Sequence, residues 1–190
     1  MLRKFFACAL FLTAYNFSSA QTISAAPKGN LFIIGGGDRN KILMQQLMKT
    51  VAMQSNDYIV VLPMSGENPD TSFYYIKQDF DSVSTSPIVS FNFTAEKSNY
   101  TPWLDSLKKA KLIFITGGDQ SRFMKIVANT PIYSAIHDAY NMGATVAGTS
   151  AGAAVMSKQM ITGNQLRGDG VSHGPDQSQT DLPGAPRARQ

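Results

Sequence analysis

Short apolar runs alternate along the chain with longer stretches in which apolar residues recur at helical spacing. The first run, 31–34, stops at three consecutive glycines, as a strand that enters a tight turn does. The stretch 42–51 then repeats apolar residues three and four positions apart, which predicts a helix with Asp38 or Asn40 as its cap. The predicted strands are 31–34, 58–62, 88–93, 112–115 and 144–147, and the predicted helices are 42–51, 71–81, 102–110, 121–142 with an interruption near Thr130 and Pro131, and 151–155.

None of the five strand runs alternates between apolar and polar residues. Continuous apolar runs are typical of strands buried on both faces, which form parallel sheets covered by helices. The sequence therefore predicts an α/β fold, a three-layer sandwich with a mostly parallel sheet. Ligands of such folds bind at the carboxyl ends of the strands. Three loops of unusual sequence follow strands at that edge, namely 35–39, 117–120 and 148–152.

The first twenty residues have the features of a secretory signal peptide. A basic pair precedes an apolar run from Phe5 to Tyr15, and Ser18 to Ala20 fit a small-x-small cleavage pattern. The run is shorter than the roughly 20 residues that a bilayer crossing needs. We therefore expect a signal peptide over 1–20, a linker over 21–29, and a secreted or periplasmic product with no membrane segment after cleavage.

The composition narrows the classes of function. A chain of 190 residues with 43% hydrophobic and 16% charged positions is expected to form one domain with a continuous core. The only cysteine, Cys8, lies in the signal segment, so no thiol chemistry is expected. The formal charge is +4, or +2 without Arg3 and Lys4, and the basic residues are scattered, which disfavours a nucleic-acid partner. No ligand spacing predicts a metal site, and no cofactor is expected.

The strongest chemical signal is Gly148-Thr149-Ser150-Ala151-Gly152, which fits G-x-S-x-G between a predicted strand and a predicted helix. In such a nucleophile elbow the tight turn strains the serine backbone, and any side chain at the glycines would collide with the neighbouring strand or helix. Ser150 is therefore the candidate nucleophile. The alternative is an ordinary helix cap, in which Ser150 binds amides of its own first turn.

A serine nucleophile also needs hydrogen-bond donors for the oxyanion. The amide of Ala151, at the start of the following helix, is one candidate, and a donor of this kind commonly contributes about 3 to 4 kcal/mol. The amides of Gly117 and Gly118 are candidates for the second donor. These glycines end the preceding strand at the same edge of the sheet and carry no side chain that would block approach.

Two segments resemble cyanophycinases: Gly148-Thr149-Ser150-Ala151-Gly152-Ala153-Ala154, and before it Phe114-Ile115-Thr116-Gly117-Gly118-Asp119-Gln120. Cyanophycinases belong with aspartyl dipeptidases to a serine peptidase family whose fold is similar to that of class I glutamine amidotransferases. The resemblance covers roughly residues 29–166. It implies cleavage of peptide bonds next to β-linked aspartate, in peptides or in cyanophycin, an aspartate polymer with arginine branches. It also implies that Ser150 is the nucleophile and that Gln120 contacts the substrate.

The resemblance is incomplete where the catalytic base should be. A serine nucleophile normally needs a histidine held by a third group, and the chain has two histidines. His137 falls in the helix before the elbow strand. In the family the base follows the serine after more secondary structure, in a run resembling Asp-Gln-His-Phe, whereas His173 follows Ser150 by 23 residues. His173 is therefore a weak candidate for the base.

The last part of the chain differs in composition from the rest. Residues 168–190 consist mainly of Gly, Pro, Gln, Asp and Arg, as in a disordered or non-homologous tail. Our hypothesis is that 30–167 is an incomplete family domain that keeps the cleft and the elbow but lacks the base and the last strands. Its unpaired strand edge is expected to make the chain poorly soluble or dependent on a partner, and a homodimer is compatible with this.

Several functions are therefore open. The leading one is a cyanophycinase-like serine exopeptidase, and the alternatives are an aspartyl dipeptidase and an inactive homologue that acts as a binding protein. A glutamine amidotransferase is disfavoured because its nucleophile is a cysteine. If the substrate carries a basic group, Glu67, Asp70 and Asp119 are candidate partners for it, and otherwise they are solvated loop charges.

Overall fold

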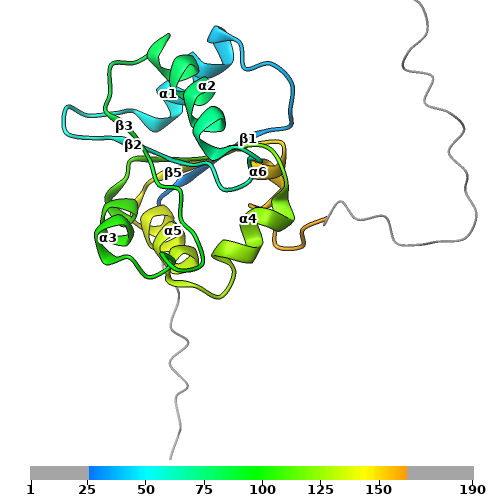
Figure 1. Cartoon of the computed structure of the whole chain (residues 1–190). Helices are drawn as coiled ribbons and strands as arrows, with labels where there is room; N and C mark the ends of the chain where they lie inside the picture. The colour runs from blue at the N-terminus through cyan, green and yellow to red at the C-terminus, as the bar shows by residue number, and fades with distance from the viewer. Residues whose placement is uncertain (1–25, 162–190) are drawn as a thin grey trace, which may run out of the picture.

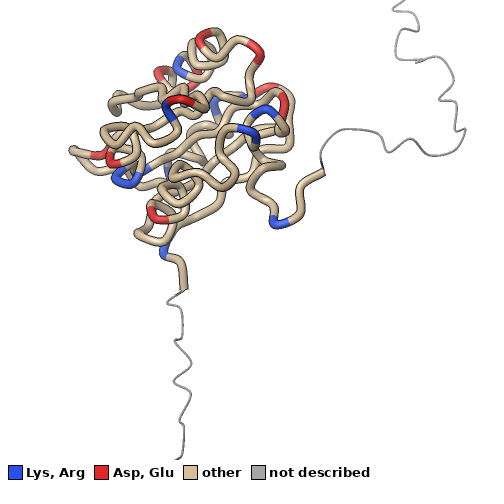
Figure 2. Tube along the Cα trace, turned by 60° about the horizontal axis from the view of Figure 1, so that its bottom comes forward, with Lys and Arg blue, Asp and Glu red and all other residues tan. Residues whose placement is uncertain are grey.

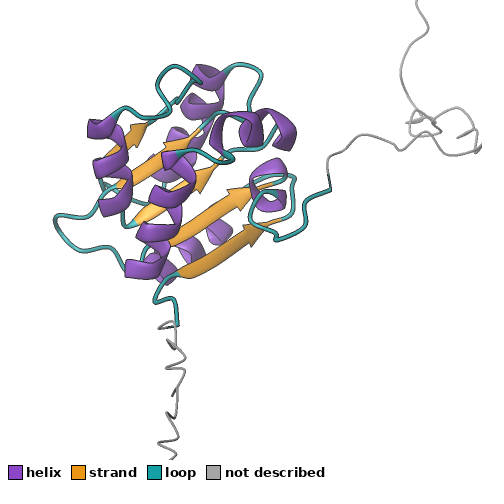
Figure 3. Cartoon of the chain, turned by 90° about the horizontal axis from the view of Figure 1, so that it is seen from below, coloured by secondary structure: helices purple, strands orange, loops and turns teal. Residues whose placement is uncertain are grey.

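The apolar runs form a five-stranded sheet in the computed structural model, which describes residues 26–161 (Figure 1). The strands lie in the order β1-β5-β4-β2-β3, and every neighbouring pair is parallel. Figure 3 shows all the arrows of the sheet pointing the same way. The strands are β1 (Asn30–Ile34), β2 (Ile59–Leu62), β3 (Ile88–Ser90), β4 (Leu112–Ile115) and β5 (Thr145–Thr149).

Helices cover both faces of this sheet (Figure 1). The chain runs outward from β1 to β3 with α1 and α2 on one face, and returns to β5 with α3, α4 and α5 on the other. The helices are α1 (Lys41–Val51), α2 (Pro69–Asp81), α3 (Thr101–Lys109), α4 (Gln120–Val127), α5 (Pro131–Met142) and the short α6 (Ala151–Ala154). The chain therefore has the three-layer α/β fold with a parallel sheet that the sequence predicts.

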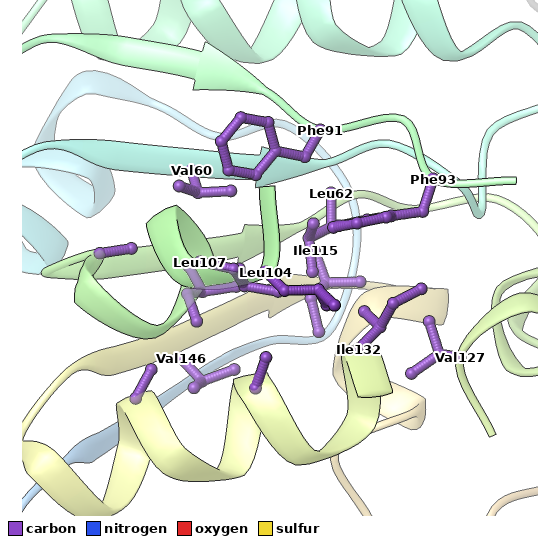
Figure 4. Packing of buried hydrophobic residues seen from close by; sticks show 14 of the residues in the cluster. Val60, Leu62, Phe91, Phe93, Leu104, Leu107, Ile115, Val127, Ile132 and Val146 are labelled. Carbon is purple, nitrogen blue, oxygen red and sulfur yellow. The ribbon is translucent and has the colours of Figure 1, made fainter. Parts of the chain in front are cut away.

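Two apolar cores hold the layers together. Figure 4 shows strand residues such as Val60 and Leu62 in the core that they share with Leu104 and Leu107 of α3. The core on the other face joins α1 and α2 to the sheet, and in it Phe114 packs edge-to-face on Phe80 with ring centroids 5.5 Å apart. Burial of a large apolar side chain contributes about 1.5–3 kcal/mol, so these cores account for much of the stability of the fold.

The helix boundaries follow from capping residues. Asn40, not Asp38, caps α1, because its side-chain oxygen accepts a 2.9 Å hydrogen bond from the Leu43 amide. The helix predicted over 71–81 begins at Pro69 instead, because Asn68 caps it and a proline is well suited to the first helical turn. The interruption predicted near residues 130 and 131 is present as the break between α4 and α5.

The prediction that every strand is buried on both faces is wrong for the two edge strands. In β1, Leu31 is 48% exposed and Ile33 is 64% exposed, whereas β2, β4 and β5 are buried throughout. β1 hydrogen-bonds only to β5 among the described strands, and α1 packs on its opposite face. β3 is shorter than the predicted 88–93, and its Val89 is 38% exposed.

Several sequence predictions concern residues outside the described range. The signal peptide over 1–20, most of the linker over 21–29, His173 and the tail over 168–190 all lie there. Within residues 26–161, no helix is long and apolar enough to cross a membrane. Basic and acidic residues are interspersed along this part of the chain (Figure 2).

Candidate active site

β5 carries Ser150 to the carboxyl edge of the sheet. The strand lies between β1 and β4, with Thr149 opposite Ile34 and Gly148 opposite Ile115. The Ser150 amide donates to the Ile34 carbonyl at 2.9 Å, which extends the β1 ladder by one more bond. All five residues of β5 are buried, whereas Ser150 itself is exposed. The candidate nucleophile thus stands at the point where a buried strand reaches solvent.

The backbone of Ser150 is strained. Its φ of 51° and ψ of −114° lie in a region that non-glycine residues rarely occupy, at a cost of about 1–3 kcal/mol. Its carbonyl accepts from the amides of Ala153 and Ala154, but its side chain forms no capping hydrogen bond. An ordinary serine cap therefore does not describe this turn, and the hydroxyl is left exposed without a bond to another described residue.

The two glycines of the elbow are required by close backbone contacts. A Cβ atom at Gly148 would collide with the carbonyl oxygen of Gly152. A Cβ atom at Gly152 would collide with the carbonyl oxygen of Ile115 in β4. The backbone of the elbow thus approaches itself and the end of β4 so closely that only glycine fits at these two positions. This agrees with the expectation from the sequence.

The turn after β4 brings Gly117 against the elbow. A Cβ atom placed on Gly117 would lie 3.4 Å from the Cβ of Ser150 and from the carbonyl oxygen of Thr149. Gly118, with a φ of 130°, faces the other way, because a Cβ there would collide with the carbonyl of Ser65. Gly117 therefore lies against the elbow, and Gly118 lies against the loop 63–68. Their role as oxyanion donors, and that of Ala151, stays a prediction.

The helix that follows Ser150 is shorter than the predicted 151–155. α6 has four residues, Ala151–Ala154, and the last carbonyls of a helix this short lie close to its first amides. Its dipole is correspondingly small, since the macrodipole sums over aligned peptide units. Any stabilisation of an oxyanion at Ala151 must therefore come from the hydrogen bond of its own amide.

Asp119 and Gln120 begin α4 beside this turn. The Asp119 carboxylate caps the helix by accepting from the amides of Ser121 at 2.7 Å and Arg122 at 3.1 Å. These hydrogen bonds, with that from Arg122 the largest cause, lower the pKa of Asp119 below its usual range. The carboxylate is thus engaged by its own helix, which weakens its candidacy as a substrate ligand. Glu67 and Asp70 are exposed.

Gln120 reaches the segment that follows the elbow helix. Its side-chain amide donates to the carbonyl oxygen of Ile161 at 2.9 Å. Gln120 therefore binds a peptide carbonyl near the elbow, which is the kind of contact that a substrate-binding residue makes. That this carbonyl belongs to the chain itself was not predicted from the sequence.

The sequence indicated only Glu67 in the loop 63–68 after β2, as a candidate partner for a basic group, and did not predict that the main chain of this loop supports the site. Ser65 in this loop is fully buried, and its carbonyl accepts from the amide of Asp119 at 2.8 Å and from Nη1 of Arg122 at 3.0 Å. The loop thereby packs against the turn that contains Gly117 and Gly118. The available signal was its position, since it follows a buried strand at the same edge of the sheet as the other three loops.

Among residues 26–161, no hydrogen bond joins His137 to Ser150. His137 lies on α5. Its ring packs at a 38° tilt against that of Tyr133, with the ring centroids 4.3 Å apart, and lines a groove beside Leu31 and Tyr140. No group of three or more His, Cys, Asp or Glu residues within 26–161 could hold a metal ion.

Comparison with known proteins decides the family. The model of Peptidase family S51 matches residues 31–177, which is most of the chain. The chain belongs to peptidase family S51. The S51 match runs past residue 167 and includes His173, while the domain boundary at 167 and the non-homologous tail stay predictions.

Named relatives of this S51 chain are cyanophycinases. It is 28% identical over 162 residues to cyanophycinase from Trichormus variabilis, covering 83% of this chain and 52% of that protein. It is also 28% identical over 163 residues to cyanophycinase from Synechococcus elongatus, covering 82% of this chain and 48% of that protein. The chain thus spans about half the length of the curated relatives it matches.

Solved structures show the same fold. A peptidase from an acI-B1 Actinobacterium superposes with a TM-score of 0.60 at 21% identity, covering 70% of this chain and 59% of that chain. A putative peptidase E from Listeria monocytogenes superposes with a TM-score of 0.52 at 16% identity, covering 67% of this chain and 61% of that chain. Identities this low establish the architecture alone.

Proposed function

We propose that this chain is a serine-type hydrolase with Ser150 as its nucleophile. The observation that carries the proposal is the conformation of Ser150, an exposed hydroxyl on a strained backbone at the end of a buried strand, with Gly117 in contact range. Strain of this kind is tolerated where the surrounding structure imposes it for a purpose. Membership in a peptidase family supports acyl transfer as the reaction.

The proposed reaction has two halves. Ser150 Oγ attacks the scissile carbonyl carbon, its proton passes to a base, and the carbonyl oxygen becomes an oxyanion held by the amides of Ala151 and of Gly117 or Gly118. The intermediate expels the amine, which takes the proton from the base. Water then hydrolyses the acyl-enzyme and restores Ser150. His173 is the candidate base, and it lies outside the described residues.

The proposed substrate is a peptide or polymer with β-linked aspartate, cleaved in an exopeptidase manner. Support comes from the relatives, which are named cyanophycinases and align over more than 80% of this chain. Gln120 is the proposed contact to a substrate carbonyl, since its amide already binds one. An arginine-bearing substrate would find the exposed carboxylates of Glu67 and Asp70 more available than that of Asp119, which caps α4. Secretion, as expected from residues 1–20, is part of the same proposal.

A binding protein without turnover is the second candidate. It is favoured by one observation: among the described residues, no histidine forms a hydrogen bond to Ser150. An aspartyl dipeptidase is the narrower enzyme alternative, and substrate length separates it from a polymer-degrading enzyme.

Labelling with a fluorophosphonate probe tests the nucleophile. Wild type is expected to bind the probe covalently, and Ser150→Ala is expected to remain unlabelled, with circular dichroism showing that both are folded. Absence of labelling in folded wild type would reject the hydrolase and favour the binding protein. If labelling occurs, two assays test the substrate: release of aspartyl-arginine units from cyanophycin, whose backbone bonds join those units, and release of free arginine from β-aspartyl-arginine dipeptide, with α-aspartyl-arginine as control.

A further inference from the structure

Arg122 reaches from α4 to a loop more than fifty residues earlier in the chain. It is the third residue of α4, and its Nη1 donates to the carbonyl oxygen of Ser65 at 3.0 Å. Arg122 is exposed as a residue, but its acceptor belongs to a residue with no exposed surface. A hydrogen bond from a charged donor to a buried carbonyl is stronger than one made in water.

The same carbonyl also fixes the turn that precedes α4. The Asp119 amide donates to the Ser65 oxygen at 2.8 Å, and the Cα of Gly118 packs so closely on this oxygen that a Cβ atom would collide with it. The Ser65 carbonyl therefore binds a main-chain donor and a side-chain donor, both at the start of α4, directly after the Gly117–Gly118 turn.

The carboxylate of Asp119 closes this arrangement. It accepts from the amides of Ser121 and Arg122, so the first turn of α4 is anchored at the residue that also donates to Ser65. The positive charge of Arg122 acts on Asp119 in the same direction as these bonds. The turn is thus held from the loop 63–68 on one side and from α4 on the other.

This restraint matters because the turn itself is made of glycines. Gly117 and Gly118 have no side chains to pack, and Gly118 has a φ of 130°, so the turn depends on its neighbours for a single conformation. Gly117 lies in contact range of Ser150, where a shift of about 1 Å is enough to misplace an oxyanion donor.

We propose that Arg122 is a positioning residue that fixes the Gly117–Gly118 turn beside Ser150 through its hydrogen bond to the Ser65 carbonyl. It acts through the turn and touches neither substrate nor nucleophile. Its effect on catalysis rests on the proposed function of Ser150, whereas its effect on the turn does not.

The test compares Arg122→Met, Arg122→Lys and Lys125→Met in the full chain. Methionine removes the hydrogen bond, lysine keeps a charged donor, and Lys125 is an exposed cation of the same helix whose charge also acts on Asp119. The readouts are amide hydrogen exchange at Asp119, measured by NMR, and the rate of fluorophosphonate labelling at Ser150. Exchange at Ile113, in the middle of β4, reports whether each variant keeps its fold.

Loss of the hydrogen bond is expected to speed exchange at Asp119 about tenfold in Arg122→Met. Arg122→Lys is expected to restore part of the protection, Lys125→Met to leave it unchanged, and labelling of Ser150 to slow several-fold in Arg122→Met only. Unchanged exchange at Asp119 in Arg122→Met would overturn the proposal, and so would an equal change in Lys125→Met, because charge and not the bond would then be responsible.

The two proposals fail in different ways. If wild type is not labelled, the hydrolase proposal fails, and exchange at Asp119 alone decides whether Arg122 holds the turn. If wild type is labelled and Arg122→Met exchanges faster yet is labelled at the wild-type rate, Arg122 is structural and the positioning role is wrong. If Arg122→Met does not fold, the comparison of Arg122→Lys with wild type decides the same question.

Discussion

The two neighbouring strands β1 and β5 have opposite relations between hydrophobicity and burial. β1 reads Asn-Leu-Phe-Ile-Ile, yet Leu31 and Ile33 are 48% and 64% exposed. β5 reads Thr-Val-Ala-Gly-Thr, yet its threonines Thr145 and Thr149 are only 1% and 4% exposed. The reason is position, because among residues 26–161 β5 has a strand on each side and β1 has a strand on one side only. Burial in this sheet therefore follows strand order more closely than it follows apolar content.

The largest difference in the free energy of unfolding is expected between a substitution in the core and one in the edge strand. Phe114→Ala removes a fully buried ring from β4 and its edge-to-face contact with Phe80, so it should lower the free energy of unfolding by about 3–5 kcal/mol. Ile33→Ala changes a side chain on the exposed face of β1 and should cost below about 1 kcal/mol. Urea unfolding of both variants measures these changes in the free energy of unfolding. Comparable losses of stability in the two variants would show that the edge strand is buried in solution.

The elbow glycines are expected to show the next largest effect. Gly152→Ala places a Cβ against the carbonyl of Ile115 and should cost about 1–3 kcal/mol and abolish labelling of Ser150. Gly35→Ala is the matched control, because a Cβ at Gly35 meets no atom within 4 Å and should be nearly neutral. Thermal unfolding and probe labelling of the two variants provide the comparison. A Gly152→Ala protein as stable and as reactive as Gly35→Ala would refute the tight elbow.

The exposed edge is expected to affect association more than stability. Ile33→Lys places a charge on the exposed face of β1, which is an edge strand of the sheet that residues 26–161 form. Charges on edge strands are a common way in which proteins prevent strand pairing between copies. Wild type should then form more dimer or larger species than Ile33→Lys in sedimentation velocity, with similar unfolding curves. Identical sedimentation of the two proteins would mean that this edge does not drive self-association.

The smallest expected effect is the pH dependence at Asp119. Because the pKa of Asp119 is lowered in the folded chain by its hydrogen bonds to α4 amides, its stabilising contribution is present above its ordinary pKa of 3.8 and is lost as the pH falls below that value. Asparagine caps helices about as well and does not titrate. The stability of wild type should therefore fall slightly more than that of Asp119→Asn on acidification, and parallel pH profiles would contradict the assignment.

Much of the fold was readable from hydrophobic patterning. The unbroken runs at 58–62 and 112–115 became central strands, and G-x-S-x-G directly after the run at 144–147 predicted an elbow that the structure contains. The burial of β1 could not be read in this way. Its run resembles a central strand, and nothing local reveals how many neighbours it has.

Some residues of the candidate site could be predicted from the sequence, and others could not. The pattern of residues was sufficient to nominate Ser150, Gly117 and Gly118, because they follow buried strands at one edge of the sheet, whereas Gln120 was nominated by the resemblance to cyanophycinases. The role of Ser65 in the loop 63–68 was not predicted, since it contributes a main-chain carbonyl, and any residue type supplies a carbonyl.

Local chemistry thus specified the parallel α/β class, the strained serine turn and the glycines that permit it. These follow from side-chain pattern and backbone sterics within a few residues. Only the tertiary structure determined four further features. They are the order of the strands, the exposure of Leu31 and Ile33, the proximity of Gly117 to Ser150, and the hydrogen bond from Arg122 to Ser65. They join segments that are between 29 and 115 residues apart in the chain, and such pairings depend on how the whole sheet packs.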